Sequence, residues 1–425
     1  MKAEIKERIE LINRGEVPEG YKKAKAGIIP VDWEAKRLGE ISEFKQGYQI
    51  PSNKQLKTPN DGYVRYLYIS DFISDSNITY VKKGEEHYII QESDICVANT
   101  GNSGGRAFRG KNGILSNNMF KIFISTDEVY NDFYWFFLNS WLYWKQLLSL
   151  FNSGGQPHVG HKNMSRIMMK LPPLPEQQKI AQILSTWDKA IQLRKQLIEE
   201  KKEQIKGLMQ WLLTGEVRLP GFDGEWEVVK LGDIGQTFNG LSGKTAKEFG
   251  EGKPFITYKN IFNNSKVDIQ DVEYVKISEN ENQNAVQYGD VFFTTSSETP
   301  DEVGMSSVLL DTVGELYLNS FCFGYRLHNF ETLIPEFARF LFRGEAFRDE
   351  IFKLSQGSTR FNLSKNEVMK LNITLPTLQE QKAIAQVLST ADKEIELLEK
   401  VLEQLKLQKK GLMQLLLTGI IRVKC

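Results

Sequence analysis

The sequence predicts an α+β protein with two domains of mixed strands and helices. A pair of long antiparallel coiled-coil helices separates them, and a pseudo-twofold internal repeat relates the halves. Two observations lead to this prediction. LPPLPEQQKIAQILSTWDKAI, starting at Leu171, returns as LPTLQEQKAIAQVLSTADKEI at Leu375, and the copies stay aligned without a gap to Arg218 and Arg422. Both copies also place apolar residues at alternating steps of three and four, as in coiled coils.

Each repeated segment is predicted to be one helix of about 40 residues, ~60 Å long at 1.5 Å per residue. Prolines stand at the start of each copy, where helices begin, and none follows inside either copy. A helix of that length with one apolar stripe needs a partner, so we expect the two helices to pair. Two alternatives remain open: each helix packs on its own domain, or the stripe docks helices of another protein. The stripe, as a helix seam and partner-docking surface, comprises Ile180, Leu184, Trp187, Ile191, Ile384, Leu388, Ile395 and Leu402.

The globular parts match each other weakly, so they have diverged while the helices have not. Runs of β-branched and aromatic residues predict strands in both parts. These runs cover residues 63–70, 87–91, 94–99 and 119–124, and then 254–261, 271–277, 290–295 and 321–327. The predicted boundaries are 1–20 for an N-terminal segment, 21–170 for the first domain, 171–218 for the first long helix, 219–374 for the second domain and 375–425 for the second long helix.

The N-terminal segment resembles the end of a long helix. RGEVPEGY at 14–21 is similar to TGEVRLPGF at 214–222. We therefore expect residues 1–20 to complete a cyclic repeat, packing where the second long helix ends.

Composition limits the possible functions. The 425 residues carry 54 Lys plus Arg and 54 Asp plus Glu, so any binding to nucleic acid must come from local basic patches or from a partner. Three widely separated cysteines exclude a disulfide framework and fit a reducing cytoplasm. No apolar run reaches the ~18–20 residues that cross a bilayer, so we expect a cytoplasmic protein without a membrane partner.

No catalytic motif stands out in the sequence. The glycine-rich segments have neither dinucleotide-binding nor phosphate-loop spacing, and the Cys and His spacings of metal sites are missing. We therefore expect no enzyme activity, no cofactor and no metal in this chain.

The motif LPxLxEQxxIAxxL, followed by a long helix and GLMQxLLTG and present twice, resembles the DNA-specificity (S) subunit of type I restriction–modification systems. The resemblance covers essentially the whole chain. It implies that each globular part is a target recognition domain for one half of a bipartite site on double-stranded DNA. The helices would set the spacer and dock two methyltransferase (M) subunits, which methylate adenine with S-adenosylmethionine. Two restriction–translocase (R) subunits would join where DNA is cut.

Candidate DNA contacts lie in the loop before each long helix, because Gln, Asn and Arg side chains can recognise base edges. The candidates are Gln156, His158 and Lys162 in the first domain, and Arg360, Asn362 and Lys365 in the second. Basic residues of other loops are candidate phosphate contacts: Arg106, Arg109, Lys111, Lys244 and Lys259. Ser296 and Ser297 are weaker candidates, since they also suit a plain turn.

Two other functions remain open. The chain would be a coiled-coil adaptor if its two domains bound proteins instead of DNA. It would be an enzyme with unrecognised motifs if it transferred methyl groups without a partner.

Overall fold

The computed structural model describes residues 3–84, 87–150, 159–357 and 359–424. The chain forms two compact units, one of Met1–Arg194 with Val401–Cys425 and the other of Lys195–Lys400. Each unit therefore contains one globular domain, the first half of one long helix and the second half of the other.

The first domain contains two four-stranded sheets. One sheet is antiparallel and has the order β4–β11–β8–β9, formed by β4 (Ser42–Gln46), β11 (Met119–Ile124), β8 (Cys96–Ala98) and β9 (Ala107–Phe108). The other has the order β10–β6–β7–β5, formed by β10 (Ile114–Leu115), β6 (Tyr63–Leu67), β7 (Tyr80–Lys82) and β5 (Gln55–Leu56). Its β10–β6 pair is parallel, whereas the other strand pairs of this sheet are antiparallel.

The second domain repeats this topology with three strands instead of four in its second sheet. Its antiparallel sheet has the order β14–β21–β17–β19, with β14 (Gly235–Asn239), β21 (Cys322–Leu327), β17 (Val291–Thr294) and β19 (Ser306–Val308). Its other sheet has the order β16–β15–β20, with β16 (Val272–Val275), β15 (Phe249–Ile256) and β20 (Tyr317–Leu318). The β15–β20 pair is again parallel. The repeat seen in the helices therefore extends through both domains.

A two-stranded ladder closes each domain just before its long helix. It pairs β3 (Glu34–Arg37) with β12 (Met168–Leu171) in the first unit, and β13 (Glu227–Lys230) with β23 (Asn372–Leu375) in the second. The remaining elements of the first domain are β1 (Tyr21–Ala24), β2 (Gly27–Pro30), α2 (Leu38–Ile41), η1 (Ser52–Lys54), η2 (Ile69–Phe72), η3 (Gly101–Ser103), α3 (Asn131–Leu138), α4 (Trp141–Ser149) and α5 (His161–Arg166). Those of the second are α7 (Leu231–Ile234), η4 (Ala246–Glu248), α8 (Tyr258–Asn263), β18 (Ser296–Ser297), α9 (Pro335–Leu341), α10 (Glu345–Leu354), β22 (Phe361–Asn362) and α11 (Lys365–Val368).

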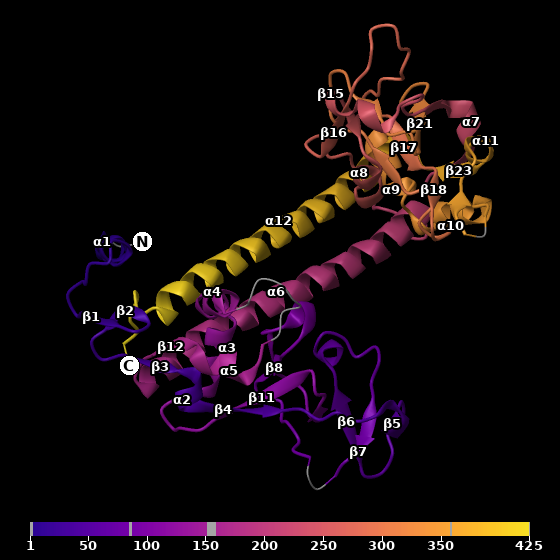
Figure 1. The fold of residues 1–425 in the computed structure, drawn as a ribbon. Helices are drawn as coiled ribbons and strands as arrows, with labels where there is room; N and C mark the ends of the chain where they lie inside the picture. The colour runs from indigo at the N-terminus through magenta and orange to yellow at the C-terminus, as the bar shows by residue number, and fades with distance from the viewer. Residues whose placement is uncertain (1–2, 85–86, 151–158, 358, 425) are drawn as a thin grey trace. The chain divides into compact units, whose positions relative to one another are not determined.

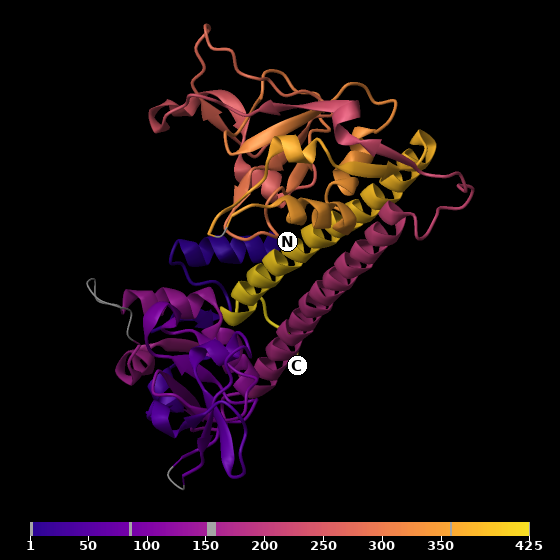
Figure 2. The same cartoon turned by 90° about the vertical axis from the view of Figure 1, so that its right-hand side faces the viewer.

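The long helices are α6 (Leu174–Thr214) and α12 (Leu378–Leu417), of 41 and 40 residues. Each is a single unbroken helix (Figures 1 and 2). Side-chain pairs show that they run antiparallel within each unit. Asp188 of α6 pairs with Lys409 of α12 in the first unit. In the second unit, Lys201 Nζ lies 2.9 Å from Glu394 Oε1 and Lys202 Nζ lies 2.8 Å from Glu399 Oε1.

The predicted seam divides into two parts. Ile180 and Leu184 are buried in the core of the first domain, together with Leu416 and Leu417 from the end of α12. The second domain repeats this arrangement with Ile384 and Leu388 of α12, joined by Leu212 and Leu213 of α6. The alternative that each helix packs on its own domain therefore holds for these first turns. Farther along, Trp187, Ile191 and Ile395 are half-buried and Leu402 is buried.

The Glu-Gln pair of the repeated motif explains why this segment has diverged so little. In the first unit, Gln177 Nε2 donates to the carbonyls of Glu128 at 2.7 Å and Pro172 at 2.8 Å, and the Tyr130 amide donates to its Oε1 at 2.8 Å. This single buried amide joins the start of α6 to the loop before α3.

Gln381 does the same in the second unit. It donates to the carbonyls of Thr332 and Pro376 and accepts from the Ile334 amide at 3.1 Å. Each glutamine thereby fastens the first turn of a long helix to its own domain.

The neighbouring glutamates bind an arginine from the far end of the other helix. Arg422 donates to both carboxylate oxygens of Glu176, at 2.8 and 2.7 Å, and to Asp32, at 2.9 and 2.6 Å. Trp33 Nε1 also donates to Glu176, at 2.9 Å, beneath the guanidinium. We call these four residues the Arg422 cluster. The hydrogen bonds to Glu176 are the main reason that the pKa of Arg422 lies above its usual value.

The second unit has an equivalent Arg218 cluster. Arg218 forms two parallel hydrogen bonds with Glu380, at 2.6 and 2.7 Å, and lies over the ring of Trp226. Only 1% of the Glu380 side chain is exposed. Its partner, Arg218, lies just after the end of α6 at Thr214. Both clusters thus fasten the end of one long helix to the beginning of the other.

We predict that Arg422→Ala lowers the free energy of unfolding by about 2 kcal/mol, because it leaves the carboxylate of Glu176, whose side chain is only 3% exposed, without its main donor. Urea denaturation of the full chain measures this change. Lys424→Ala, which removes an exposed charge from the same tail, is the control. Equal stability of the two variants would show that the cluster does not hold the tail.

The N-terminal segment contacts the end of α12. A guanidinium nitrogen of Arg8, in α1 (Ala3–Asn13), donates to the Ile420 carbonyl at 2.6 Å, and the Tyr21 hydroxyl donates to the Gly419 carbonyl at 2.6 Å. Gly419 has a φ of +76°, and a Cβ there would lie 2.7 Å from the Pro30 ring. These contacts are the ones expected of a segment that completes a cyclic repeat. Among the described helices, every one is too short or too polar to cross a membrane.

Candidate nucleic-acid interface

The loop before α11 in the second domain pairs with the segment after β17. β22 and β18 form an antiparallel ladder that sets Asn362 opposite Ser296 and Phe361 opposite Ser297. The amide of Leu363 also donates to the carbonyl of Thr295 at 2.9 Å. The structure thus brings Arg360 and Asn362 next to the two serines, which the sequence analysis had considered separately.

The first domain has the corresponding junction. The Val159 amide donates to the carbonyl of Asn99, directly after β8, at 2.8 Å. Lys162 is exposed on α5, which follows. Gln156 and His158 lie outside the described residues. Val159 and Leu363 therefore occupy equivalent places in the two domains.

The predicted phosphate contacts differ in whether an acidic side chain already pairs with them. Arg106 and Lys259 are exposed, as phosphate binding requires. Arg109 instead forms an ion pair with Asp132 at 2.6 Å and lies over the Trp135 ring.

Two further lysines are also held within their domains. Lys111 pairs with Asp75 at 2.8 Å. Lys244, only 3% exposed, lies between Glu248 and Glu281. Arg109, Lys111 and Lys244 are therefore poorer phosphate candidates than the sequence alone indicated. Lys365 donates to the side chain of Asn239 from the start of α11, so it too has a partner.

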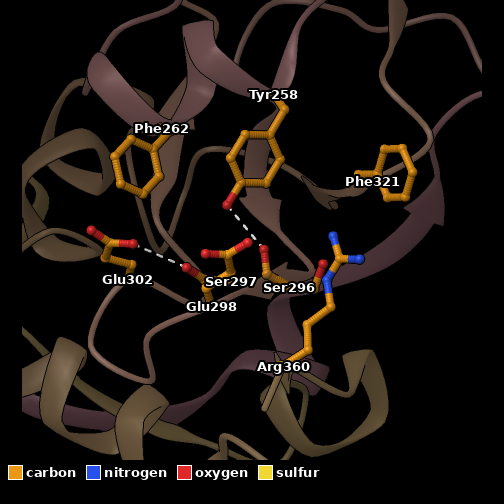
Figure 3. Close-up of a pocket in the computed structure, with 8 residues that line it drawn as sticks. All are labelled: Tyr258, Phe262, Ser296, Ser297, Glu298, Glu302, Phe321 and Arg360. Carbon is orange, nitrogen blue, oxygen red and sulfur yellow. Dashed lines mark hydrogen bonds between the residues drawn. The ribbon is translucent and has the colours of Figure 1, made fainter.

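A cavity of about 360 Å³ opens at the β18–β22 ladder (Figure 3). Its walls come from four separate segments of the second domain, comprising Tyr258 and Phe262 of α8, Ser296, Ser297, Glu298 and Glu302 after β17, Phe321 before β21, and Arg360. We call it the Arg360 pocket. It combines aromatic faces, two carboxylates and one guanidinium.

Hydrogen bonds hold part of this lining in place. The Tyr258 hydroxyl donates to the Ser296 carbonyl at 2.9 Å, and burial raises the pKa of that hydroxyl. The Tyr258 and Phe262 rings stack with centroids 6.0 Å apart. Ser297 Oγ donates to Glu302 Oε2 at 3.0 Å. Phe321 is 57% exposed at the mouth, beside the guanidinium of Arg360 (Figure 3).

Two half-buried arginines hold segments that form the pocket. Arg343 donates to the carbonyls of Ile261, Phe262 and Asn264 at 2.7–2.9 Å, which caps the end of α8. Burial lowers the pKa of Arg343 to about 10.

Arg348 fixes the other side. It donates to the carbonyls of Asp301, Val303 and Gly304 at 2.7–2.8 Å and so fixes the loop that carries Glu302. Hydrogen bonds from these two arginines therefore hold two of the four segments that line the pocket.

A model of the type I restriction modification DNA specificity domain family matches residues 30–203 and 223–407, which contain both candidate loops. The chain belongs to this family. It is 29% identical to the MjaVIII specificity subunit of Methanocaldococcus jannaschii, over 96% of this chain and 97% of that protein. It is 22% identical to the EcoKI specificity subunit of Escherichia coli K12, over 84% of this chain and 82% of that one.

Solved structures from type I restriction–modification systems share the fold. A chain from a structure describing complex assembly and conformational transition of the type I R-M system has a TM-score of 0.62 at 18% identity, covering 92% of this chain and 99% of that chain. The specificity subunit from M. genitalium has a TM-score of 0.52 at 14% identity, covering 90% and 96%. The predicted fold class and family resemblance are therefore confirmed.

The sequence analysis of this family member missed several residues of the pocket. Tyr258 and Phe321 lay in segments predicted as strands, and Phe262 and the two glutamates were not singled out. The lengths of two corresponding loops, one in each domain, could have indicated the pocket. The amides of Gly105 and Gly304 donate to the last carbonyls of β8 and β17, so residues 99–104 correspond to 295–303, a loop longer by three residues. The longer loop carries both glutamates.

A basic cavity in the first domain was also missed. It has a volume of about 650 Å³, and its lining includes Lys54, Lys82, Lys83 and Tyr63 at the sheet containing β5 and β7. Among the described residues, these three lysines form no ion pair. Positive charge beside an aromatic ring suits the backbone and bases of nucleic acid. In the described part of the chain, no group of His, Cys, Asp or Glu side chains is placed to hold a metal ion.

Proposed function

We propose that this chain is the DNA-recognition subunit of a type I restriction–modification complex and that each domain recognises one half of a bipartite site. The subunit itself carries no catalysis. Adenine methylation, with S-adenosylmethionine as methyl donor, belongs to two methyltransferase subunits that dock on the long helices. Cleavage belongs to restriction–translocase subunits where these are present.

The observation that carries the proposal is the contrast between constant and varied parts within one family member. The sheets of the two domains have closely similar topologies, and in both domains a residue before the long helix, Val159 or Leu363, donates its amide to the carbonyl of the residue that follows β8 or β17. The side chains at these equivalent places nevertheless differ, as expected if the domains recognise different half-sites. The Glu-Gln pair and the arginine clusters recur in both units, as expected of a shared scaffold.

Zero net charge is compatible with this role. Phosphate contacts supply much of the affinity of DNA-binding proteins, and partner subunits contribute these contacts in a complex. The exposed Arg106 and Lys259 and the cavity lined by Lys54, Lys82 and Lys83 add local positive charge.

The direct test is co-expression with the methyltransferase encoded in the same genome, in a host that lacks adenine methylation. Long-read sequencing then maps the methylated sites. We expect a two-part motif with a fixed spacer that appears only when both proteins are present. Methylation by this chain alone would favour an enzyme, and methylation by the partner alone at the same motif would exclude a role in recognition.

We predict that Arg360→Ala or Asn362→Ala weakens discrimination at one half-site by about 1–3 kcal/mol, the value of a good side-chain contact to a base. Both side chains are exposed, so the fold should be retained. The methylation motif should relax on one side only, and the other half-site is the internal control. Equal loss on both sides would contradict separate recognition by the two domains.

A coiled-coil adaptor for protein partners is not favoured. The family model describes a DNA specificity domain and matches both halves of the chain.

A further inference from the structure

We propose that the Arg360 pocket recognises a G·C base pair in the half-site of the second domain, with Arg360 on the guanine and Glu298 on its cytosine. The inference rests on the proposed function and adds the base pair to it. Guanine presents two acceptors to the major groove, which suit the two-pronged guanidinium, and cytosine presents an N4 amino group, which suits a carboxylate.

Some polar side chains of the Arg360 pocket already have hydrogen-bond partners within the protein, and others do not. Glu302 accepts from Ser297, and the hydroxyl of Tyr258 is used by the carbonyl of Ser296. Arg360 and Glu298 are both exposed, and neither forms an ion pair among the described residues. In Figure 3 the guanidinium of Arg360 extends into the space beside Phe321. The fork of donors on Arg360 and the carboxylate of Glu298, which has no hydrogen-bond partner among the described residues, are thus left to face a ligand, whereas one oxygen of Glu302 is already occupied.

The second argument is electrostatic. A carboxylate that faces DNA repels the phosphates, so it lowers affinity unless a base amino group donates to it. Phosphate binding alone would favour lysines in this loop. Two carboxylates beside an arginine instead indicate recognition of base edges, with exposed Lys259 on α8 left for the phosphates.

The third argument is preorganisation. Arg343 holds the end of α8 and Arg348 holds the loop of residues 301–304, each through three or more carbonyls. A fixed pocket loses less conformational entropy on binding, so it discriminates between ligands more sharply. Arg343 and Arg348 are positioning residues, because they act through the segments that they hold.

The comparison between domains limits the inference to one half-site. The corresponding loop of the first domain is shorter and carries Asn102 and Ser103, without a carboxylate. The chemistry of the Arg360 pocket is therefore not repeated in the described part of the first domain, and its loss should alter one side of the motif only.

The experiment uses the full chain in complex with its methyltransferase. Competition binding with duplexes that differ at single base pairs measures discrimination at each position. We expect one G·C position in the second half-site at which Glu298→Gln reduces discrimination about tenfold. The variant should accept adenine in place of the cytosine, because glutamine pairs well with adenine. Arg360→Lys should lower preference at the same position, since lysine has no fork.

Glu279→Gln is the matched control, since it makes the same change at an exposed glutamate of the same domain outside the pocket. Melting temperatures of all variants report folding. A half-site without a G·C pair, or equal discrimination by the Glu298 and Glu279 variants, would overturn the inference while leaving the proposed function intact. A wild-type complex without any sequence preference would overturn both.

Discussion

Removing one heptad from each long helix should shorten the unread spacer of the DNA motif by about three base pairs. Seven residues correspond to ~10 Å of helix, and base pairs are spaced ~3.4 Å apart along DNA. Residues 195–201 of α6 and 399–405 of α12 are suitable, because they are equivalent in the repeat and lie away from the core clusters of both domains. Mapping of methylated sites in the co-expression system reads the spacer directly.

The control removes a heptad from α6 alone. That change breaks the register of pairs such as Lys202 with Glu399, both of which it retains, and should abolish methylation instead of shifting the spacer. An unchanged spacer after the matched double excision would mean that the helices do not set it.

Leu388→Ala should destabilise the protein by about 2–5 kcal/mol, the cost of a cavity in a well-packed core. Leu388 is fully buried against the second domain, although it belongs to the predicted helix seam. Leu184→Ala should have a similar effect in the first domain. Urea denaturation, followed by circular dichroism, measures both changes.

Exposed leucines of the same helices serve as controls. Leu397 is 62% exposed and Leu193 is 55% exposed, so their replacement by alanine should change stability by less than about 0.5 kcal/mol. A small effect at Leu388, equal to that at Leu397, would show that α12 does not form part of the domain core.

The repeat made much of the architecture predictable from sequence. Residues that recur at a constant offset mark shared structure, and the Glu-Gln pair and the two arginines proved to join helices to domains. The heptad pattern could not distinguish a helix partner from a domain partner. Ile180 and Leu184 satisfy the coiled-coil spacing, yet they pack in the first domain. A partner helix and a domain core each bury the same apolar stripe of a long helix.

Local patterns were less dependable for short strands. Residues 87–91 have the composition of a strand, but within the described part of this segment the pairing is a single bridge between Ile90 and Gly113. Strand propensity reports a half-buried pleated surface, and a short segment satisfies it without forming a ladder.

The Arg360 pocket could not be predicted from the sequence, for a different reason. Its residues come from four segments separated by up to about a hundred positions, and only tertiary folding brings Tyr258, Phe321 and Arg360 together. Sequence analysis found Arg360 and the serines because they lie in or beside loops that the repeat marks as variable. Tyr258 and Phe321 lay in segments predicted as strands, and no pattern in the sequence marked Phe262.

The most direct test of separate recognition replaces the second domain, residues 219–374, with a second copy of the first, residues 21–170. Methylation mapping of this chain with its methyltransferase then gives the motif. Because the two units are related by a pseudo-twofold repeat, we expect the new motif to carry the first half-site twice, in inverted order. A motif that still contains the original second half-site would contradict the assignment of one half-site to each domain.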